Sequence, residues 1–100
     1  MHPLEPDIIV SAHFYSEDEG GRKTATPPDR FGCIFTFDGE NFDCFLLLEN
    51  IGAVKPGDLV QVPIKFLHPQ LVKSRLRIGS SFILRELRTI AEGQVREILP

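Results

Sequence analysis

The sequence is poor in several residue types that often mark a binding or metal site. It has no tryptophan, one tyrosine, one methionine and two cysteines among 100 residues. The spacing of Cys33 and Cys44 matches no zinc signature, and the further ligands that zinc needs are missing. Both cysteines fall in strand-like runs, so we expect buried free thiols. Eight phenylalanines, against no tryptophan and a single tyrosine, indicate a phenylalanine-rich core.

The chain also lacks a long apolar run and an excess of positive charge. No run is long enough for a membrane span, and the N-terminus has neither the basic nor the apolar region of a signal peptide. We therefore expect no membrane contact and a cytoplasmic location. The formal net charge of -3 argues against a dedicated nucleic-acid-binding domain, although it leaves room for a local basic patch.

What is present is the composition of one folded domain. A length of 100 residues suits a single domain, and contents of 42% hydrophobic and 25% charged residues are typical of a globular chain. Residues 1–6 contain two prolines and are expected to form a flexible lead-in. Residues 7–100 are expected to form the domain itself.

Apolar and polar residues alternate in several short runs, which is the pattern of strands with one buried face. Asp38-Gly39 separates two of these runs and predicts a tight hairpin, because glycine tolerates the positive φ of that turn. Residues 55–58 (KPGD) are typical of a type II turn. The predicted strands are residues 7–15, 31–37, 41–48, 59–67, 78–87 and 88–99.

The C-terminal part leaves one alternative open. Residues 81–97 are rich in leucine, arginine, glutamate and alanine, which favour helix. The alternation elsewhere and the interruption at Gly93 favour strands. Six short strands joined by turns predict an all-β fold, a single six-stranded antiparallel β-barrel.

Four segments carry a family resemblance: residues 16–24 (SEDEGGRKT), 55–62 (KPGDLVQV), 67–69 (LHP) and 76–93 (LRIGSSFILRELRTIAEG). In order and spacing they resemble the C-terminal β-barrel domain, the third domain, of bacterial elongation factor Tu. The resemblance extends over nearly the whole chain. It implies a six-stranded antiparallel β-barrel with a translation-related role. Because the first predicted strand begins at Asp7, we expect a stand-alone chain without the GTPase domain.

In that family the barrel contacts the T-arm of tRNA, the GTPase domain and the exchange factor. Glu86 matches a family glutamate near the T-stem backbone. Three other positions depart from the family pattern: Leu87 replaces a glycine, Gly32 a glutamine and Asp43 a threonine. A carboxylate at position 43 stands where a phosphate would need a hydrogen-bond donor, so the departures favour a protein partner over tRNA.

The candidate binding residues are mostly basic. Lys73, Arg75 and Arg77 occupy alternate positions, which would place their charges on one face of an extended chain. The alternative is that Arg22 and Lys23 neutralise the preceding acidic run, and that the other charges form a solvated barrel face. The full candidate set for RNA or partner binding is Arg22, Lys23, Lys73, Arg75, Arg77, Arg85, Glu86 and Arg88.

The sequence predicts a non-catalytic protein-interaction module. Outward-facing apolar residues of the strands are expected to form a patch for a translation factor or a second copy of the chain; they are Ile34, Phe45, Leu47 and Ile83. The alternative is an RNA (tRNA)-binding module that uses the basic residues. The histidines are scattered, and Arg22-Lys23-Thr24 lacks the glycine pattern of a phosphate-binding loop. We therefore expect no enzymatic activity, cofactor, metal or nucleotide.

Overall fold

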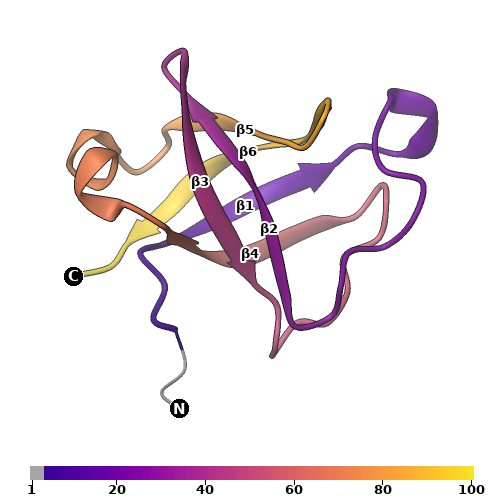
Figure 1. The fold of residues 1–100 in the computed structure, drawn as a ribbon, viewed down its shortest axis with the longest axis horizontal. Helices are drawn as coiled ribbons and strands as arrows, with labels where there is room; N and C mark the ends of the chain where they lie inside the picture. Colours follow the sequence, from indigo (N-terminus) through magenta and orange to yellow (C-terminus); the bar gives the residue numbers. More distant parts are fainter. Residues whose placement is uncertain (1–3) are drawn as a thin grey trace.

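Within residues 4–100, which the computed structural model describes, six strands close into an antiparallel barrel in the order β1-β4-β3-β2-β5-β6 (Figure 1). The strands are β1 (Ile8–Phe14), β2 (Arg30–Phe37), β3 (Glu40–Leu47), β4 (Leu59–Phe66), β5 (Ser81–Arg85) and β6 (Thr89–Ile98). Short 3₁₀ helices lie in the connections: η1 (Glu17–Glu19), η2 (Pro69–Leu71) and η3 (Lys73–Arg75). The predicted all-β, six-stranded antiparallel barrel is confirmed. Of the predicted lead-in, residues 1–3 lie outside the described part of the chain.

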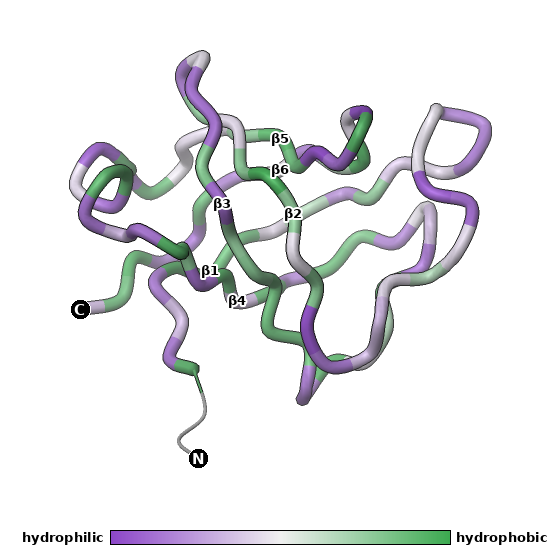
Figure 2. Tube along the Cα trace, viewed as in Figure 1, coloured by the Kyte–Doolittle hydropathy of each residue, from purple (hydrophilic) through white to green (hydrophobic). Residues whose placement is uncertain are grey.

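Alternate residues of each strand fill the interior of the barrel, as the geometry of a pleated sheet requires. Figure 2 shows the apolar stretches along the strands and the hydrophilic stretches at the loops. Phenylalanines occupy the centre of the core. The ring of Phe35 packs edge-to-face on Phe66, with centroids 5.0 Å apart, and stacks on Phe82 at 4.5 Å. The expected phenylalanine-rich core is therefore confirmed.

Both predicted turns form where glycine permits them. Asp38 and Gly39 have φ values of 52° and 77°, and a primed hairpin turn needs positive φ at both of these positions. Gly57 has a φ of 91°, and the amide of Asp58 donates to the carbonyl of Lys55 at 3.0 Å. This geometry is that of a type II turn. The two turns fix the register of β2 against β3 and the start of β4.

Cys33 and Cys44 lie directly opposite each other on β2 and β3, with their Sγ atoms 3.7 Å apart. Both are buried free thiols, as the sequence predicts. The neighbouring Cys33 thiol and burial together raise the pKa of the Cys44 thiol. The pair thus belongs to the core.

The segment between β4 and β5 differs from the sequence-based prediction. The sequence predicts extended chain over residues 70–77, but this segment folds into η2 and η3. Pro69 suits the start of η2, since a first helical residue needs no N–H donor. Val72 and Leu76 are both buried, and their spacing of four residues fits a helical turn better than a strand. Strand β5 consequently begins at Ser81 rather than near residue 78.

The helical alternative for residues 81–97 is wrong. This segment forms β5 and β6, joined by a tight turn in which the amide of Glu86 donates to the carbonyl of Arg88 at 3.0 Å. Strand β5 pairs with β2 and β6 pairs with β1, so both are needed to close the barrel. Tertiary pairing overrides the helix propensity of the residues. No helix within residues 4–100 has the length and apolar character that crossing a membrane takes.

Candidate functional site

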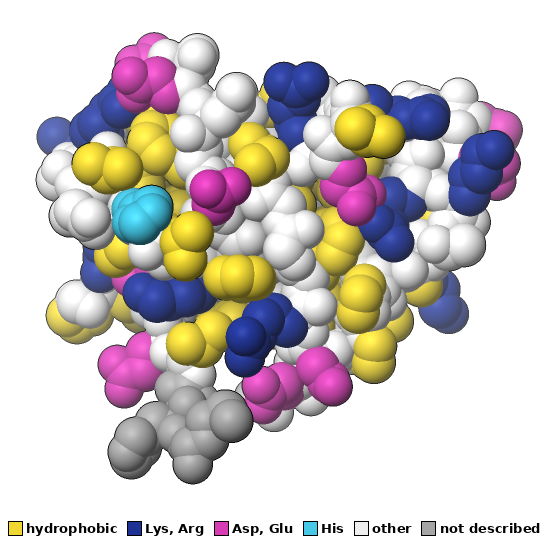
Figure 3. Space-filling model, viewed as in Figure 1, with side chains coloured by type: hydrophobic (Ala, Val, Ile, Leu, Met, Phe, Trp, Pro, Cys, Tyr) yellow, Lys and Arg dark blue, Asp and Glu magenta, His cyan; other side chains and the backbone are white. Residues whose placement is uncertain are grey.

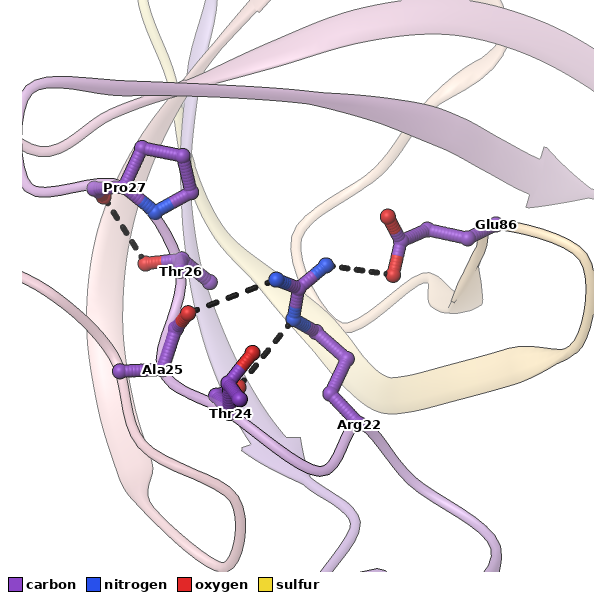
Figure 4. A network of polar contacts seen from close by, with 6 residues as sticks. All are labelled: Arg22, Thr24, Ala25, Thr26, Pro27 and Glu86. Atoms are coloured by element: carbon purple, nitrogen blue, oxygen red, sulfur yellow. Dashed lines mark hydrogen bonds and ion pairs between the residues drawn. The ribbon is translucent and has the colours of Figure 1, made fainter.

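Arg22 joins the loop after β1 to the turn between β5 and β6 (Figure 4). Its Nη1 lies 2.6 Å from Oε1 of Glu86, and the guanidinium also donates to the carbonyls of Thr24 at 3.3 Å and Ala25 at 3.4 Å. Its central carbon lies 4.8 Å from the centroid of the Phe31 ring. The predicted neutralisation of the acidic run by Arg22 is wrong, because Arg22 pairs with a carboxylate 64 residues further along the chain.

The acidic run forms η1 and stabilises that helix itself. Ser16 begins a capping box: its Oγ accepts from the Glu19 amide at 3.3 Å, and Oε1 of Glu19 accepts from the Ser16 amide at 2.9 Å. These backbone and side-chain hydrogen bonds lower the pKa of Glu19. Gly20 ends the helix with a φ of 93°. Glu19 therefore holds this loop through its capping hydrogen bonds and not through Arg22 or Lys23.

The barrel brings one group of predicted site residues together. Arg22, Lys23, Glu86 and Arg88 line a hollow of about 320 Å³ between the loop after β1 and the β5–β6 turn. Leu87, at the tip of that turn, is fully exposed. Lys23 and Arg88 are also exposed, whereas Arg85 is half-buried on β5. These residues come from two segments that sequence alone does not connect.

The other predicted basic residues do not share a face. Lys73 lies 3.8 Å from the buried carboxylate of Asp7. Arg75 binds Glu40 and lies 3.5 Å from Asp38, beside the β2–β3 turn. The Arg77 side chain donates to backbone carbonyls of its own segment, at 3.0 and 3.1 Å. The predicted alternation on one face is wrong because η3 turns successive side chains in different directions.

The four predicted outward apolar residues lie along a diagonal across three neighbouring strands. Register sets Ile34 opposite Arg85 and Thr36 opposite Ile83, so the two isoleucines are diagonal neighbours. On the other side of β2, Ile34 is likewise diagonal to Phe45, which precedes Leu47 by two positions on β3. Diagonal neighbours in a sheet lie within reach of long side chains. All four are half-buried, and we call them the outer apolar stripe.

A small hollow extends this stripe at its Leu47 end. It measures about 220 Å³, and its apolar lining consists of Leu4, Pro6, Leu47, Ile51 and Pro63. Leu4 and Ile51 remain 39% and 41% exposed, so apolar surface stays open to a partner. Figure 3 shows this side of the molecule, with hydrophobic side chains spread among charged ones. We call this hollow the Leu47 hollow.

One polar cluster was not predicted from the sequence. The hydroxyl of Tyr15 donates to Oε2 of Glu92 at 3.2 Å, and Nε2 of His13 lies 3.8 Å from Oε1 of Glu19. Burial, the hydrogen bond to Glu92 and the charges of Glu92 and Glu19 raise the pKa of Tyr15. Tyr15 and Glu92 are 77 residues apart in sequence, so no local pattern signals their contact.

Within residues 4–100, no three histidine, cysteine, aspartate or glutamate side chains form a group suited to a metal ion. Comparison with known proteins found no matching family model and no matching curated protein. The architecture is that of a small antiparallel six-stranded β-barrel, and the assignment to the elongation factor Tu barrel stays a prediction.

Proposed function

We propose that this barrel is a non-catalytic protein-interaction module that binds its partner through the outer apolar stripe and the Leu47 hollow. The observation that carries the proposal is the open apolar surface around Leu47, where a hollow adjoins a row of half-exposed apolar side chains. Protein interfaces combine such an apolar centre with a polar rim. Glu49 and Asn50, which border the hollow, supply a polar rim here.

The charges of the basic residues support a protein partner over RNA. Arg22, Lys73 and Arg75 each pair with a carboxylate of the same chain. A nucleic-acid surface instead offers its positive charges to phosphates, whose binding releases counterions. Because these three side chains already pair with carboxylates of the chain, their charges are not free to bind phosphates.

The resemblance to the third domain of elongation factor Tu supports a translation-related setting. A closed six-stranded antiparallel barrel is the architecture that this resemblance implies. In this proposal the partner is a translation factor or a second copy of the chain, and the domain contributes binding surface alone.

Leu47→Asp, compared with Ile78→Asp, tests the proposal. Ile78 is 64% exposed in the turn before β5 and serves as the matched control. Sedimentation equilibrium of the wild-type protein first shows whether it self-associates. If the wild type is monomeric, its capture of a protein from extract is compared with capture by both variants. We expect Leu47→Asp to weaken association by about 30-fold, the loss typical of a central interface residue, and Ile78→Asp to have no effect. Equal association by all three proteins would rule out the outer apolar stripe as the binding surface.

RNA binding is the second candidate, and one observation favours it. Lys23 and Arg88 are both exposed at the same hollow, and among the described residues neither forms an ion pair. A titration of the protein with bulk tRNA at low and near-physiological salt tests this candidate. Saturable binding that weakens steeply with salt and is lost in Lys23→Glu/Arg88→Glu would support it. No binding at low salt would eliminate it.

A further inference from the structure

A groove of about 550 Å³ crosses the outside of the barrel on the side opposite β3. Strand registers place its lining in rows. In the first row, His13 of β1, Glu92 of β6 and Ile83 of β5 lie side by side, and Leu59 of β4 and Thr36 of β2 extend the row at its two ends. Residues on strands hold their positions well, because neighbouring strands fix the backbone on both sides.

The second row explains why the surface is hollow there. Ser11, Gln94 and Ser81 lie side by side, and the two serines on the flanks are small. Between the rows lies Gly93, which pairs with Phe82 of β5. A Cβ atom on Gly93 would lie 2.9 Å from the Phe82 ring and 2.1 Å from the Ser11 carbonyl oxygen, so only glycine fits. The serines leave the groove open, whereas Gly93 faces the core and lets β6 pack closely against β1 and the Phe82 ring.

Glu92 lines the groove, and Glu19 lies beside its end, with Oε1 3.8 Å from Nε2 of His13. Hydrogen bonds of the protein hold both carboxylates in place. Oε2 of Glu92 accepts from the Tyr15 hydroxyl, and Oε1 of Glu19 accepts from the Ser16 amide. Among the described residues, the second oxygen of each carboxylate accepts no hydrogen bond. Acceptors that are already positioned lose little conformational freedom when a ligand binds.

Apart from Glu92 and the imidazole of His13, the lining carries no ionisable side chain. It offers hydroxyl and amide groups together with the apolar surfaces of Leu59, Phe82 and Ile83, and it includes no lysine or arginine. At the far edge, Nε of Arg96 donates to Oγ of Ser11 at 2.9 Å. A phosphate or other anion would therefore meet two carboxylates at one end of the groove, whereas a cation finds acceptors there.

We propose that this groove binds an extended peptide segment of a partner protein whose arginine or lysine side chain lies against Glu92 and Glu19. A guanidinium or ammonium group forms charge-assisted hydrogen bonds with the free carboxylate oxygens. The methylene stem of such a side chain covers apolar surface, which Leu59, 77% exposed, provides next to His13. The hydroxyl and amide groups of the second row are left to bind the peptide backbone.

The groove shares Ile83 with the outer apolar stripe, but Glu92 lies outside the stripe and Leu47 lies outside the groove, so each proposal can fail without the other. The test uses three short peptides, acetylated and amidated, that differ only in a central arginine, norleucine or glutamate. Binding is followed by the amide resonances of Gly93 and Gln94 and by the fluorescence of Tyr15, the single tyrosine of the chain. Glu92→Gln removes one charge, and Glu97→Gln, an exposed position on the same strand outside the groove, is the matched control.

We expect the arginine peptide alone to shift the groove resonances, and Glu92→Gln to weaken its binding about tenfold, as loss of a hydrogen bond to a charged group does. Glu97→Gln and the stripe variant Leu47→Asp should bind it as the wild type does. Glu19→Gln, which keeps the capping box while removing charge, should also weaken binding, so the result does not depend on one variant folding. Equal binding of the glutamate peptide, unchanged binding by Glu92→Gln, or no shift at millimolar arginine peptide would overturn the proposal.

Discussion

Replacing Arg22 with alanine should destabilise the barrel by about 2–3 kcal/mol, summed from an ion pair, a cation–π contact and two carbonyl hydrogen bonds. The Arg22 and Glu86 side chains are 20% and 38% exposed, so solvent screens their ion pair in part and it contributes about 1 kcal/mol. The contact with the Phe31 ring adds about 0.5–1 kcal/mol. The hydrogen bonds to Thr24 and Ala25, at 3.3 and 3.4 Å, are long, and together they add about 0.5–1 kcal/mol.

Two variants separate these contributions. Arg22→Lys keeps the positive charge but loses the planar fork that reaches Glu86 and the carbonyl groups together, so we expect an intermediate loss of stability. Lys23→Ala changes the exposed neighbour and should alter the unfolding free energy by less than about 0.5 kcal/mol. A double-mutant cycle with Glu86→Ala isolates the ion pair from the other contacts of Arg22.

Urea denaturation followed by circular dichroism measures these differences. In a domain of this size each 1 kcal/mol of lost stability also lowers Tm by about 4–8 °C. If Arg22→Ala proves as stable as Lys23→Ala, the contacts of Figure 4 do not hold the loop to the barrel. Arg22 would then belong with Lys23 among the residues available to a ligand.

Three further outcomes follow from the structure. Gly93→Ala should prevent folding or destabilise the barrel by more than about 3 kcal/mol, because the Cβ of the alanine would overlap the backbone of β1. Thermal melting of the variant at the wild-type Tm would contradict this. An ultraviolet absorbance titration should show Tyr15 ionising above its ordinary pKa of 10.0, and Glu92→Gln should lower the pKa of Tyr15. Because the pKa of Tyr15 is raised in the folded state, the contribution of Tyr15 to stability is complete below pH 10. This contribution is lost as the pH rises through the folded-state pKa. The buried Cys44 thiol, whose pKa is raised by Cys33 and by burial, should react slowly with an alkylating reagent at neutral pH and quickly in denaturant, and rapid alkylation of the native protein would contradict its placement in the core.

The features that the sequence predicted correctly are local. The Asp38-Gly39 hairpin follows from the backbone freedom of two adjacent residues. Alternation with a period of two identifies the inward faces, and the outward position of Phe45 follows from the same count. Since β1, β2, β3 and β4 each carry this signal over seven or eight residues, the barrel could be predicted before its closure was known.

The remaining contacts depend on barrel closure, which brings distant segments together. Glu86 becomes the partner of Arg22 only because the turn between β5 and β6 comes to lie against the loop after β1. Lys73 and Arg75 do not share a face, because η3 replaces the expected extended chain. The sequence signal for that helix is the four-residue spacing of Val72 and Leu76, which is short. The groove needs the register of β1, β5 and β6, which no single segment encodes.

The measurement that tests the central proposal most directly is site-specific photo-crosslinking in cells from position 47, compared with position 78. We expect a protein adduct from position 47, its loss when Phe45 is replaced by aspartate, and no comparable adduct from position 78. Phe45 lies over Gly32 on the outside of the barrel and is not part of the core, so Phe45→Asp should leave the fold intact. Adducts of equal yield at both positions, or an adduct to RNA alone, would contradict a protein-binding role for the outer apolar stripe.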